Sequence, residues 1–147
     1  MPFYFKDYPD FTPDLSPREI FILGSFGGTY WRPIHSRVTN KNYKNEHKKF
    51  PFLADLPNSI MTLQHYDKNI NKYKVKVGTT LEYWESKGWI TKYDPYGWVQ
   101  WYCNFFAGRR IPEEDERQIK RWIAIKKRFN KDTPAIRQTL QHWAILL

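Results

Sequence analysis

The clearest hydrophobic pattern in the chain is a stripe of large rings within residues 98–106. The rings recur every three or four residues, which is the spacing of one helix face: Trp98, Trp101, Tyr102, Phe105 and Phe106. Gly108 follows them and suits the end of the helix. A stripe of this kind is more typical of a core than of an exposed stacking surface. The pattern therefore predicts a buried helix that Asp94-Pro95 opens.

A second helix is predicted over residues 112–128. Its first position is a proline, acidic residues follow at 113–116 and basic residues end it at 126–128, so its charges complement the helix dipole. The helix is amphipathic, and six bases share it: Arg117, Lys120, Arg121, Lys126, Lys127 and Arg128. Such a basic face is ordinary on a solvated helix, and it also suits a phosphate backbone.

Capping signals predict three shorter helices, over residues 17–23, 81–87 and 134–146. A capping box formed by Ser16 and Glu19 begins the first of them. Thr79 or Thr80 caps the second. The third begins at the Thr133-Pro134 pair.

The other segments are predicted to lack long regular elements. Residues 1–15 are rich in aromatic residues and proline, which predicts an extended arm. Residues 24–34 form a loop punctuated by glycines, and residues 37–50 read as a polar, basic loop. One short helix is expected near residues 58–65. Residues 72–77 alternate in the manner of one isolated strand or extended segment.

These elements predict a single compact domain of the mainly α class across residues 1–147. It has long ordered loops, an extended aromatic N-terminal arm over residues 1–15 and a mainly helical body over residues 16–147. No internal repeat or flexible linker divides the chain.

Composition excludes several classes of protein. Hydrophobic residues are 41% of the 147, which is enough for one core. The chain has no run of about 18 apolar residues, so no membrane partner is expected, and no secretory signal is visible. The single cysteine, Cys103, cannot form an internal disulfide. We therefore expect an intracellular location, in the nucleus or cytoplasm, or in a virion if the chain is viral.

The charge of the chain points to a class of partner. The formal net charge is +9, and aromatic residues make up 18% of the chain. Residues 32–76 hold ten of the 24 basic residues and only three of the 15 acidic ones. A basic loop region on a folded frame is one way to present charge to phosphates. The alternative is a solvated surface that keeps the protein soluble.

Four segments of the chain together resemble a known family. They read FGGTYWRPI (residues 26–34), LEYWESKGW (81–89), DPYGWVQWYCNFFAGRR (94–110) and DERQIKRW (115–122). They are similar to a family of small, basic, Trp-rich uncharacterised proteins of fungi, algae, plants and some large DNA viruses. The similarity covers about residues 20–123. It implies a coherent domain and no assigned activity.

The leading hypothesis is a protein that binds DNA or RNA through phosphate and stacking contacts with little dependence on base sequence. Five residues are the expected phosphate contacts: Arg32, Arg37, Lys41, Arg109 and Arg110. Three rings beside charges are the expected stacking residues: Tyr30, Trp31 and Tyr96. Tyr43 and Trp89 are further rings of this kind.

Two parts of this hypothesis have structural alternatives. Backbone N–H groups around Gly27 and Gly28 suit a phosphate, but the glycines also suit the packing of the neighbouring rings. Arg109 and Arg110 suit phosphate, but they also suit internal ion pairs with Asp94 or with the acids at 113–116.

Catalytic and metal-binding patterns are sparse. The histidines have no metal-ligand spacing, so no metal site and no cofactor is expected: His35, His47, His65 and His142. Cys103 lies in the aromatic helix and reads as a buried small residue. An enzyme that acts on a phosphorylated or nucleic-acid substrate is one alternative, with the Gly27–Gly28 loop and His35 in its site, and His35 could pair with Asp94 or Glu85. Its catalytic residues are not identified.

Another alternative is a structural protein, such as a virion or chromatin component. Its exposed aromatic N-terminal arm, residues 1–15, would dock on a protein partner.

Overall fold

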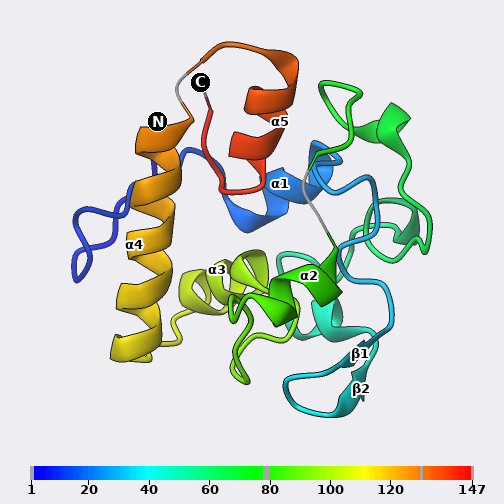
Figure 1. Cartoon of the computed structure of the whole chain (residues 1–147), viewed down its shortest axis with the longest axis horizontal. Coiled ribbons are helices and arrows are strands. Elements are labelled where there is room, and N and C mark those ends of the chain that lie inside the picture. The colour runs from blue at the N-terminus through cyan, green and yellow to red at the C-terminus, as the bar shows by residue number, and fades with distance from the viewer. Residues whose placement is uncertain (1, 78–79, 130, 147) are drawn as a thin grey trace.

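The structure is a computed structural model that describes residues 2–77, 80–129 and 131–146. The regular secondary structure of the described residues is mostly helical, with five α-helices: α1 (Pro17–Ile22), α2 (Leu81–Ser86), α3 (Trp98–Phe106), α4 (Pro112–Arg128) and α5 (Pro134–Gln141) (Figure 1). Two short strands, β1 (Ile34–Ser36) and β2 (Lys41–Tyr43), pair as an antiparallel hairpin. Three single 3-10 turns lie between the hairpin and α2: Glu46–Lys49, Asn58–Ile60 and Lys68–Ile70. None of the described helices combines the length and apolarity needed to cross a membrane.

Helix α3 forms the centre of the core. Four rings of the predicted stripe are buried, with exposed fractions of 6% or less, and the fifth is partly buried. Helices α1 and α4 both pack against α3. The prediction that this stripe is core is therefore confirmed.

The helix ends follow local chemistry that the sequence displays. At α1, the Ser16 hydroxyl accepts from the Glu19 N–H while the Glu19 carboxylate accepts from the Ser16 N–H, which is the predicted capping box. Thr80 caps α2 by accepting from the Tyr83 N–H, and Thr79 lies outside the described residues. The acidic first turn and basic last turn of α4 are as predicted.

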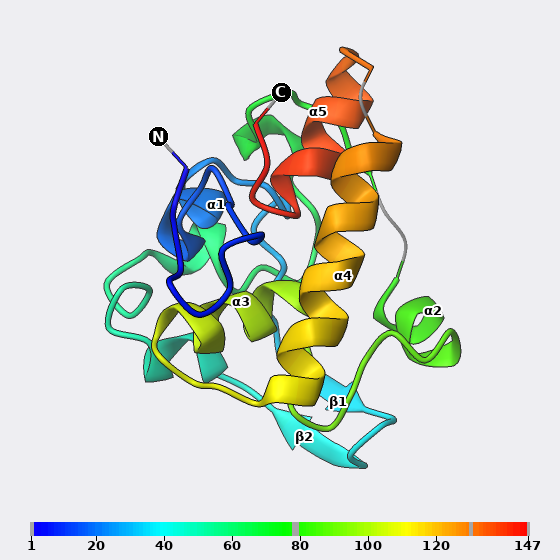
Figure 2. The same ribbon diagram turned by 90° about the vertical axis from the view of Figure 1, so that its left-hand side faces the viewer.

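The N-terminal segment, residues 2–15, has neither helix nor strand, and its rings are part of the core. Phe11 is fully buried and contacts five aromatic residues of α3 and α4. Phe5 and Tyr8 pack edge-on against Phe105. The segment lies beside α4 on one side of the molecule (Figure 2). The expectation of an exposed docking arm is therefore wrong for these rings, although Tyr4 is exposed.

Three expected segments differ from the structure. Residues 72–77 form no strand, and Lys74 has a positive φ of 56°. The expected loop at residues 37–50 instead contains β2 and a 3-10 turn, with His35 Nδ1 and Asn42 Oδ1 2.7 Å apart across the hairpin. The expected helix near residues 58–65 is only the turn Asn58–Ile60.

Helix α5 is shorter than predicted and ends at Gln141 instead of about Leu146. Ala144 has a φ of 60°, which breaks the helical path. Its carbonyl accepts from the N–H groups of Asp14 and Leu15, at 2.8 and 3.2 Å. The C-terminal residues thus bind the N-terminal segment, a long-range interaction that no local pattern reports.

Candidate functional site

The three rings expected to stack on bases are buried. Tyr30, Trp31 and Tyr96 have exposed fractions of 4%, 0% and 2%. The Tyr30 hydroxyl donates to the Tyr96 carbonyl at 2.9 Å, and the Tyr96 hydroxyl donates to the Arg32 carbonyl at 2.7 Å. Their rings pack against one another and against other protein rings, so the expectation that they stack on bases is wrong.

The glycine loop, residues 24–34, is closely packed against other parts of the chain. Gly27 and Gly28 both have positive φ, 59° and 84°, and a Cβ at Gly27 would meet the Tyr66 ring at 2.5 Å. A Cβ at Gly28 would meet the Ser59 carbonyl at 2.7 Å. Both glycines are buried, and their carbonyls accept from the N–H groups of Asp67 and Leu63. The loop is therefore closed by protein, as in the packing alternative, and not shaped to receive a phosphate.

Arg109 and Arg110 are partly exposed but bind carboxylates of the chain. Arg109 forms a two-pronged ion pair with Asp94, which is 1% exposed. Arg110 binds Asp7 at 2.7 Å and lies over the Phe105 ring, 3.7 Å from its centre. The internal ion-pair alternative holds for both, although Arg110 pairs with Asp7 and not with the acids at 113–116.

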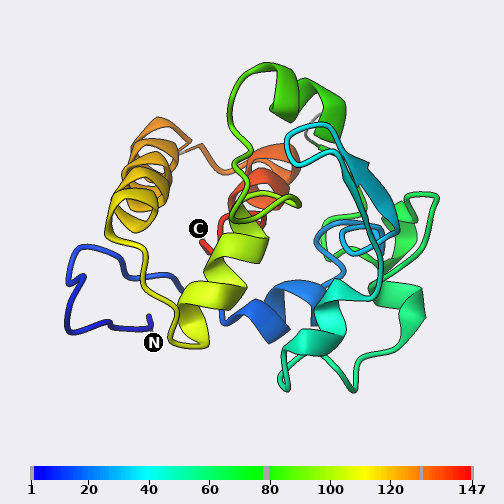
Figure 3. The same ribbon diagram turned by 90° about the horizontal axis from the view of Figure 1, so that it is seen from below.

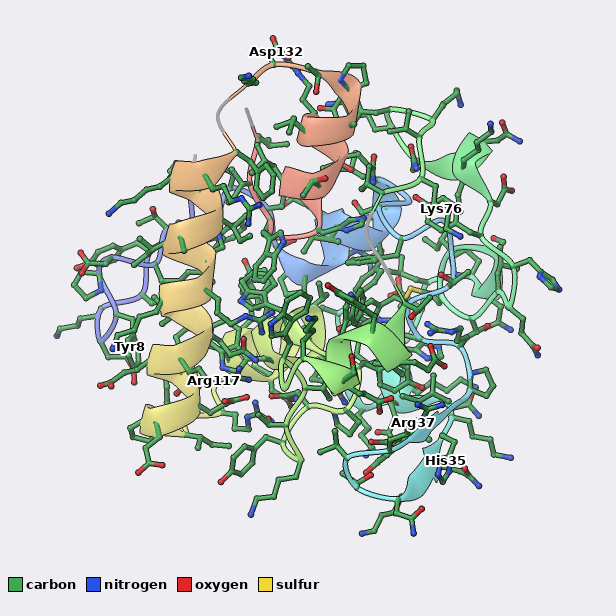
Figure 4. All side chains as sticks on the ribbon, in the orientation of Figure 1. Tyr8, His35, Arg37, Lys76, Arg117 and Asp132 are labelled. Carbon is green, nitrogen blue, oxygen red and sulfur yellow. The ribbon has the colours of Figure 1, made fainter. Side chains whose placement is uncertain are left out.

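The other expected phosphate contacts lie away from these two. Arg32, Arg37 and Lys41 belong to the hairpin and the turn before it, and none forms an ion pair with a described carboxylate. The hairpin and the α3–α4 connection, which carries residues 109 and 110, lie on opposite sides of α3 (Figure 3). Figure 4 places Arg37 beside His35 on the hairpin, with Arg117 across the molecule on α4. The structure thus separates the expected phosphate contacts into two groups.

The titratable groups considered for catalysis are dispersed or buried. His35 faces Asn42, and Glu85 accepts from the Arg37 backbone N–H at 2.9 Å, so neither forms the expected pair. Cys103 is fully buried, and burial raises the pKa of its thiol. Within the described residues, no three His, Cys, Asp or Glu side chains are grouped as metal ligands.

A concavity lies between α2, α4 and the end of α5, and we call it the aromatic cleft. Its volume is about 710 Å³. Eight of its lining residues are aromatic: Phe26, Tyr30, Tyr83, Trp84, Trp89, Trp98, Phe129 and Trp143. Two lining residues are cationic, Arg121 and Arg128, and no acidic residue is among the described residues that line it. Trp89 and Tyr83 are 39% and 43% exposed, so their rings reach the solvent.

Arg121 is the central polar group of the aromatic cleft. Its guanidinium carbon lies 5.2 Å from the Trp143 ring centre and 5.9 Å from that of Trp89. Its Nη1 donates to Gln118 Oε1 at 2.8 Å and to the Trp89 carbonyl at 3.4 Å. Burial, assisted by the charge of Arg117, lowers the pKa of Arg121 to about 10, so the group is still cationic at neutral pH.

Glu114 is the acid whose charge acts on Arg121, but its carboxylate already accepts hydrogen bonds from other side chains. Glu114 accepts from Arg117 Nε and from the Thr91 hydroxyl, both at 2.8 Å, and from Gln118 at 3.3 Å. Burial opposes ionisation of Glu114, but these hydrogen bonds hold its pKa below the usual value. Arg121 is thus a half-buried cation that forms no ion pair with a described carboxylate.

A second concavity adjoins the aromatic cleft, and we call it the basic cavity. Its volume is about 380 Å³, and its charged lining residues are Arg32, Lys76 and Glu82. Arg32 Nη1 donates to the Thr29 carbonyl at 3.1 Å. Four residues line both concavities: Phe26, Tyr30, Trp84 and His142. Arg32 and Arg121 therefore lie on two neighbouring concavities that share one aromatic wall.

Several of these residues could be singled out from the sequence, but their proximity to one another could not. Trp89 was a possible stacking residue because it stands near Lys92, and Arg121 was one of six bases on one helix. The capping and periodicity signals place α2, α4 and α5, but they do not report that the three helices surround a cleft. No local signal distinguishes Arg121 from Lys120.

Comparisons with known proteins assign no family to the chain. No protein-family model matches it, and no solved structure matches it. It is similar to mitogen-activated protein kinase kinase kinase 3 of Mus musculus, at 25% identity over 91 residues. That match covers 60% of this chain, which spans 14% of the length of the kinase. The sequence contains neither the H-R-D nor the D-F-G triplet of protein kinases, so the match supplies no catalytic residue.

Proposed function

We propose that the protein binds nucleic acid through phosphate contacts that depend little on base sequence. The observation that supports this best is the placement of Arg32 and Arg121. Each guanidinium is partly buried on a concavity, makes hydrogen bonds only to neutral oxygens in the described chain, and has N–H donors left over. Phosphate oxygens are strong partners for such donors.

The wider charge distribution supports the same proposal. Six of the 24 lysines and arginines form ion pairs with carboxylates of the described chain: Arg18, Lys49, Arg109, Arg110, Arg117 and Arg137. The other eighteen have no such pair. A nucleic acid backbone neutralises excess positive charge of this kind and releases its counterions, which makes binding favourable at low salt.

The proposed contacts come from the hairpin side and from α4. Arg32, Arg37 and Lys41 remain from the sequence-based set, and Arg121 and Arg128 replace Arg109 and Arg110. The hairpin is joined to α2 by the bond between the Arg37 N–H and Glu85, and α2 also lines the aromatic cleft. The two groups of cations therefore flank one helix, so that a single strand passing α2 would meet both.

The cellular location and the family resemblance also remain proposals. We infer an intracellular location from the single, buried Cys103. The resemblance to the small basic Trp-rich family rests on residues that serve the core, such as Trp98, Trp101 and Trp122. It supports a shared fold and assigns no activity.

Fluorescence anisotropy with a labelled DNA or RNA oligonucleotide at several salt concentrations tests the proposal. The logarithm of affinity should fall linearly with the logarithm of salt concentration. The double variant Arg32→Gln/Arg121→Gln should weaken binding and reduce the slope by roughly 1.4 to 1.8, because each lost contact removes about 0.7 to 0.9.

The matched control is Arg18→Gln/Arg137→Gln, which also removes two positive charges. Both of these arginines already bind aspartates, Asp55 and Asp132. Its slope should stay close to that of the wild type. Absence of binding at low ionic strength, or an equal effect of both double variants, would contradict the proposal.

A further inference from the structure

The aromatic cleft has the chemistry of a site for a planar ring that carries a negative charge nearby. Eight aromatic residues line it, and its two charged lining residues are both arginines. Its volume of about 710 Å³ lies within the usual range for small-ligand sites. A neutral apolar guest would leave the two cations without an anionic partner, whereas an anion would complement their charge.

Trp89 is the ring best placed to receive a planar guest. It is 39% exposed, and its one close ring partner in the described chain, Tyr83, meets it edge-on at 5.6 Å and 75°. The Trp89 carbonyl accepts from Arg117 and Arg121, each at 3.4 Å, which fixes the backbone while the ring reaches solvent. A base can stack on such a ring whatever its identity, since every base has a π-face.

Arg121 is placed to hold the negative charge of that guest. It lies 5.9 Å from the Trp89 ring centre, and two of its hydrogen bonds go to neutral oxygens. A guanidinium has five N–H donors, so donors remain for a phosphate. Arg128 follows two helical turns later, about 10 Å along α4, and lines the same cleft.

We propose that the aromatic cleft holds one unpaired nucleotide of a single-stranded nucleic acid, with its base on Trp89 and a phosphate on Arg121. This inference rests on the proposed function and narrows it. A base inside a duplex is stacked on both faces and is not free to enter a cleft, so the site selects single strands or flipped bases. A free nucleotide also carries a base beside a phosphate, and the test distinguishes a nucleotide within a strand from a free one.

The test compares three labelled ligands of about eight nucleotides each, which is within the usual site size. They are an oligothymidylate, the same backbone with abasic positions, and a duplex. The protein is the full chain, and binding is measured by anisotropy at low salt. The oligothymidylate should bind more tightly than the abasic strand or the duplex.

Two variants assign the preference to the cleft. Trp89→Ala should weaken oligothymidylate binding about 5- to 150-fold, in line with the loss of one stacked base, and should change abasic-strand binding much less. Its control is Tyr93→Ala, which removes another exposed ring, 44% accessible, that does not line the cleft. Arg121→Lys should weaken binding of both strands, and the exposed neighbour Lys120→Gln should change it less.

Each outcome decides between the proposals. Equal binding of the intact and abasic strands, or an equal effect of Trp89→Ala and Tyr93→Ala, would overturn the base-in-cleft inference while phosphate binding stands. Thymidine monophosphate that competes as well as the strand would overturn the strand assignment in favour of a free nucleotide. Failure of every ligand to bind at low salt would overturn the proposed function itself.

Discussion

Arg109 binds Asp94 through both of its terminal nitrogens, with Nη1 3.0 Å from Oδ1 and Nη2 2.6 Å from Oδ2. Asn104 donates to the same carboxylate at 2.9 Å, and the Arg109 backbone N–H donates to the Asn104 carbonyl. The pair therefore ties the segment before α3 to the segment after it. Because Asp94 is 1% exposed, Arg109 compensates a buried charge and is not free for a ligand.

The variant Arg109→Met should destabilise the protein by about 3 to 5 kcal/mol at pH 7, because it leaves a buried carboxylate without its cation. Burial raises the pKa of Asp94, and Arg109 opposes this effect. Without Arg109 the native state should hold a proton on Asp94 more tightly than the unfolded state does, so the loss should shrink as the pH falls towards 4. Urea denaturation at pH 7 and at pH 4 measures both effects.

The control for this prediction is Arg18→Met. Arg18 pairs with Asp55, but the two side chains are 39% and 64% exposed. Water screens a pair this exposed, so Arg18→Met should destabilise the protein much less than Arg109→Met does. Equal losses in the two variants would mean that the Asp94 pair has no special structural role.

Phe11 should be as important to stability as the rings of α3, although it lies in a segment without regular structure. Its ring is fully buried, 5.0 Å from the Trp122 ring centre and 5.5 Å from that of Trp101. Phe11→Ala should therefore cost about 3 to 5 kcal/mol. Tyr4→Ala removes a ring that is 67% exposed and should stay within about 0.5 kcal/mol. Urea denaturation compares the two variants. A small loss of stability in Phe11→Ala would instead support an N-terminal arm that projects from the body.

The helices were predictable because their signals are local. The capping box at Ser16 and the dipole-matched charges of α4 involve residues within one or two turns of each other. The burial of the aromatic stripe follows from its spacing alone. Sequence neighbours hold the needed information in each of these cases.

The site was less predictable because its partners are distant in the sequence. The Tyr30 hydroxyl meets the Tyr96 carbonyl 66 residues away, and Arg110 meets Asp7 103 residues away. A ring next to a charge in the sequence looks the same whether tertiary packing buries it or exposes it. The prediction of base stacking was therefore wrong for Tyr30, and Trp89 was only a minor candidate for it.

Gly27 and Gly88 provide a matched test of the packing role assigned to the glycine loop. Both have positive φ, 59° and 72°, so an alanine is strained at either position. Only Gly27 also faces an obstacle, since its Cβ would meet the Tyr66 ring at 2.5 Å, whereas nothing lies within 4 Å at Gly88. Gly88→Ala should cost about 1 kcal/mol and Gly27→Ala more than about 2 kcal/mol. Thermal unfolding measures the order, and a reversed order would contradict the packing role.

His142 joins α5 to the glycine loop and is expected to make stability depend on pH. Its Nε2 donates to the Ser25 carbonyl at 2.8 Å, which makes the neutral ring a donor at Nε2. The Phe26 ring stacks on it at 4.1 Å. Burial lowers the pKa of His142 to about 4, although the hydrogen bond to Ser25 acts in the other direction.

The direction of the pH effect follows from this lowered pKa. Between about pH 4 and the unfolded value near 6.5, the unfolded chain binds a proton at His142 and the folded chain does not. The stability contributed by the neutral ring is therefore fully present above pH 6.5 and decreases as the pH falls. From pH 8 to pH 5 this one group should cost roughly 2 kcal/mol.

The variant His142→Phe isolates this effect, because the other titrating groups are present in both proteins. At pH 8 the variant should be less stable than the wild type, since the Ser25 carbonyl loses a hydrogen bond. At pH 5 the difference should shrink by roughly 2 kcal/mol, because only the wild type then bears the cost of a proton excluded from the folded state. Urea denaturation of both proteins at pH 8, 6.5 and 5 measures the difference at each pH. A difference that stays constant would mean that His142 titrates alike in the folded and unfolded chains, and that its ring is open to water where it lines the two concavities.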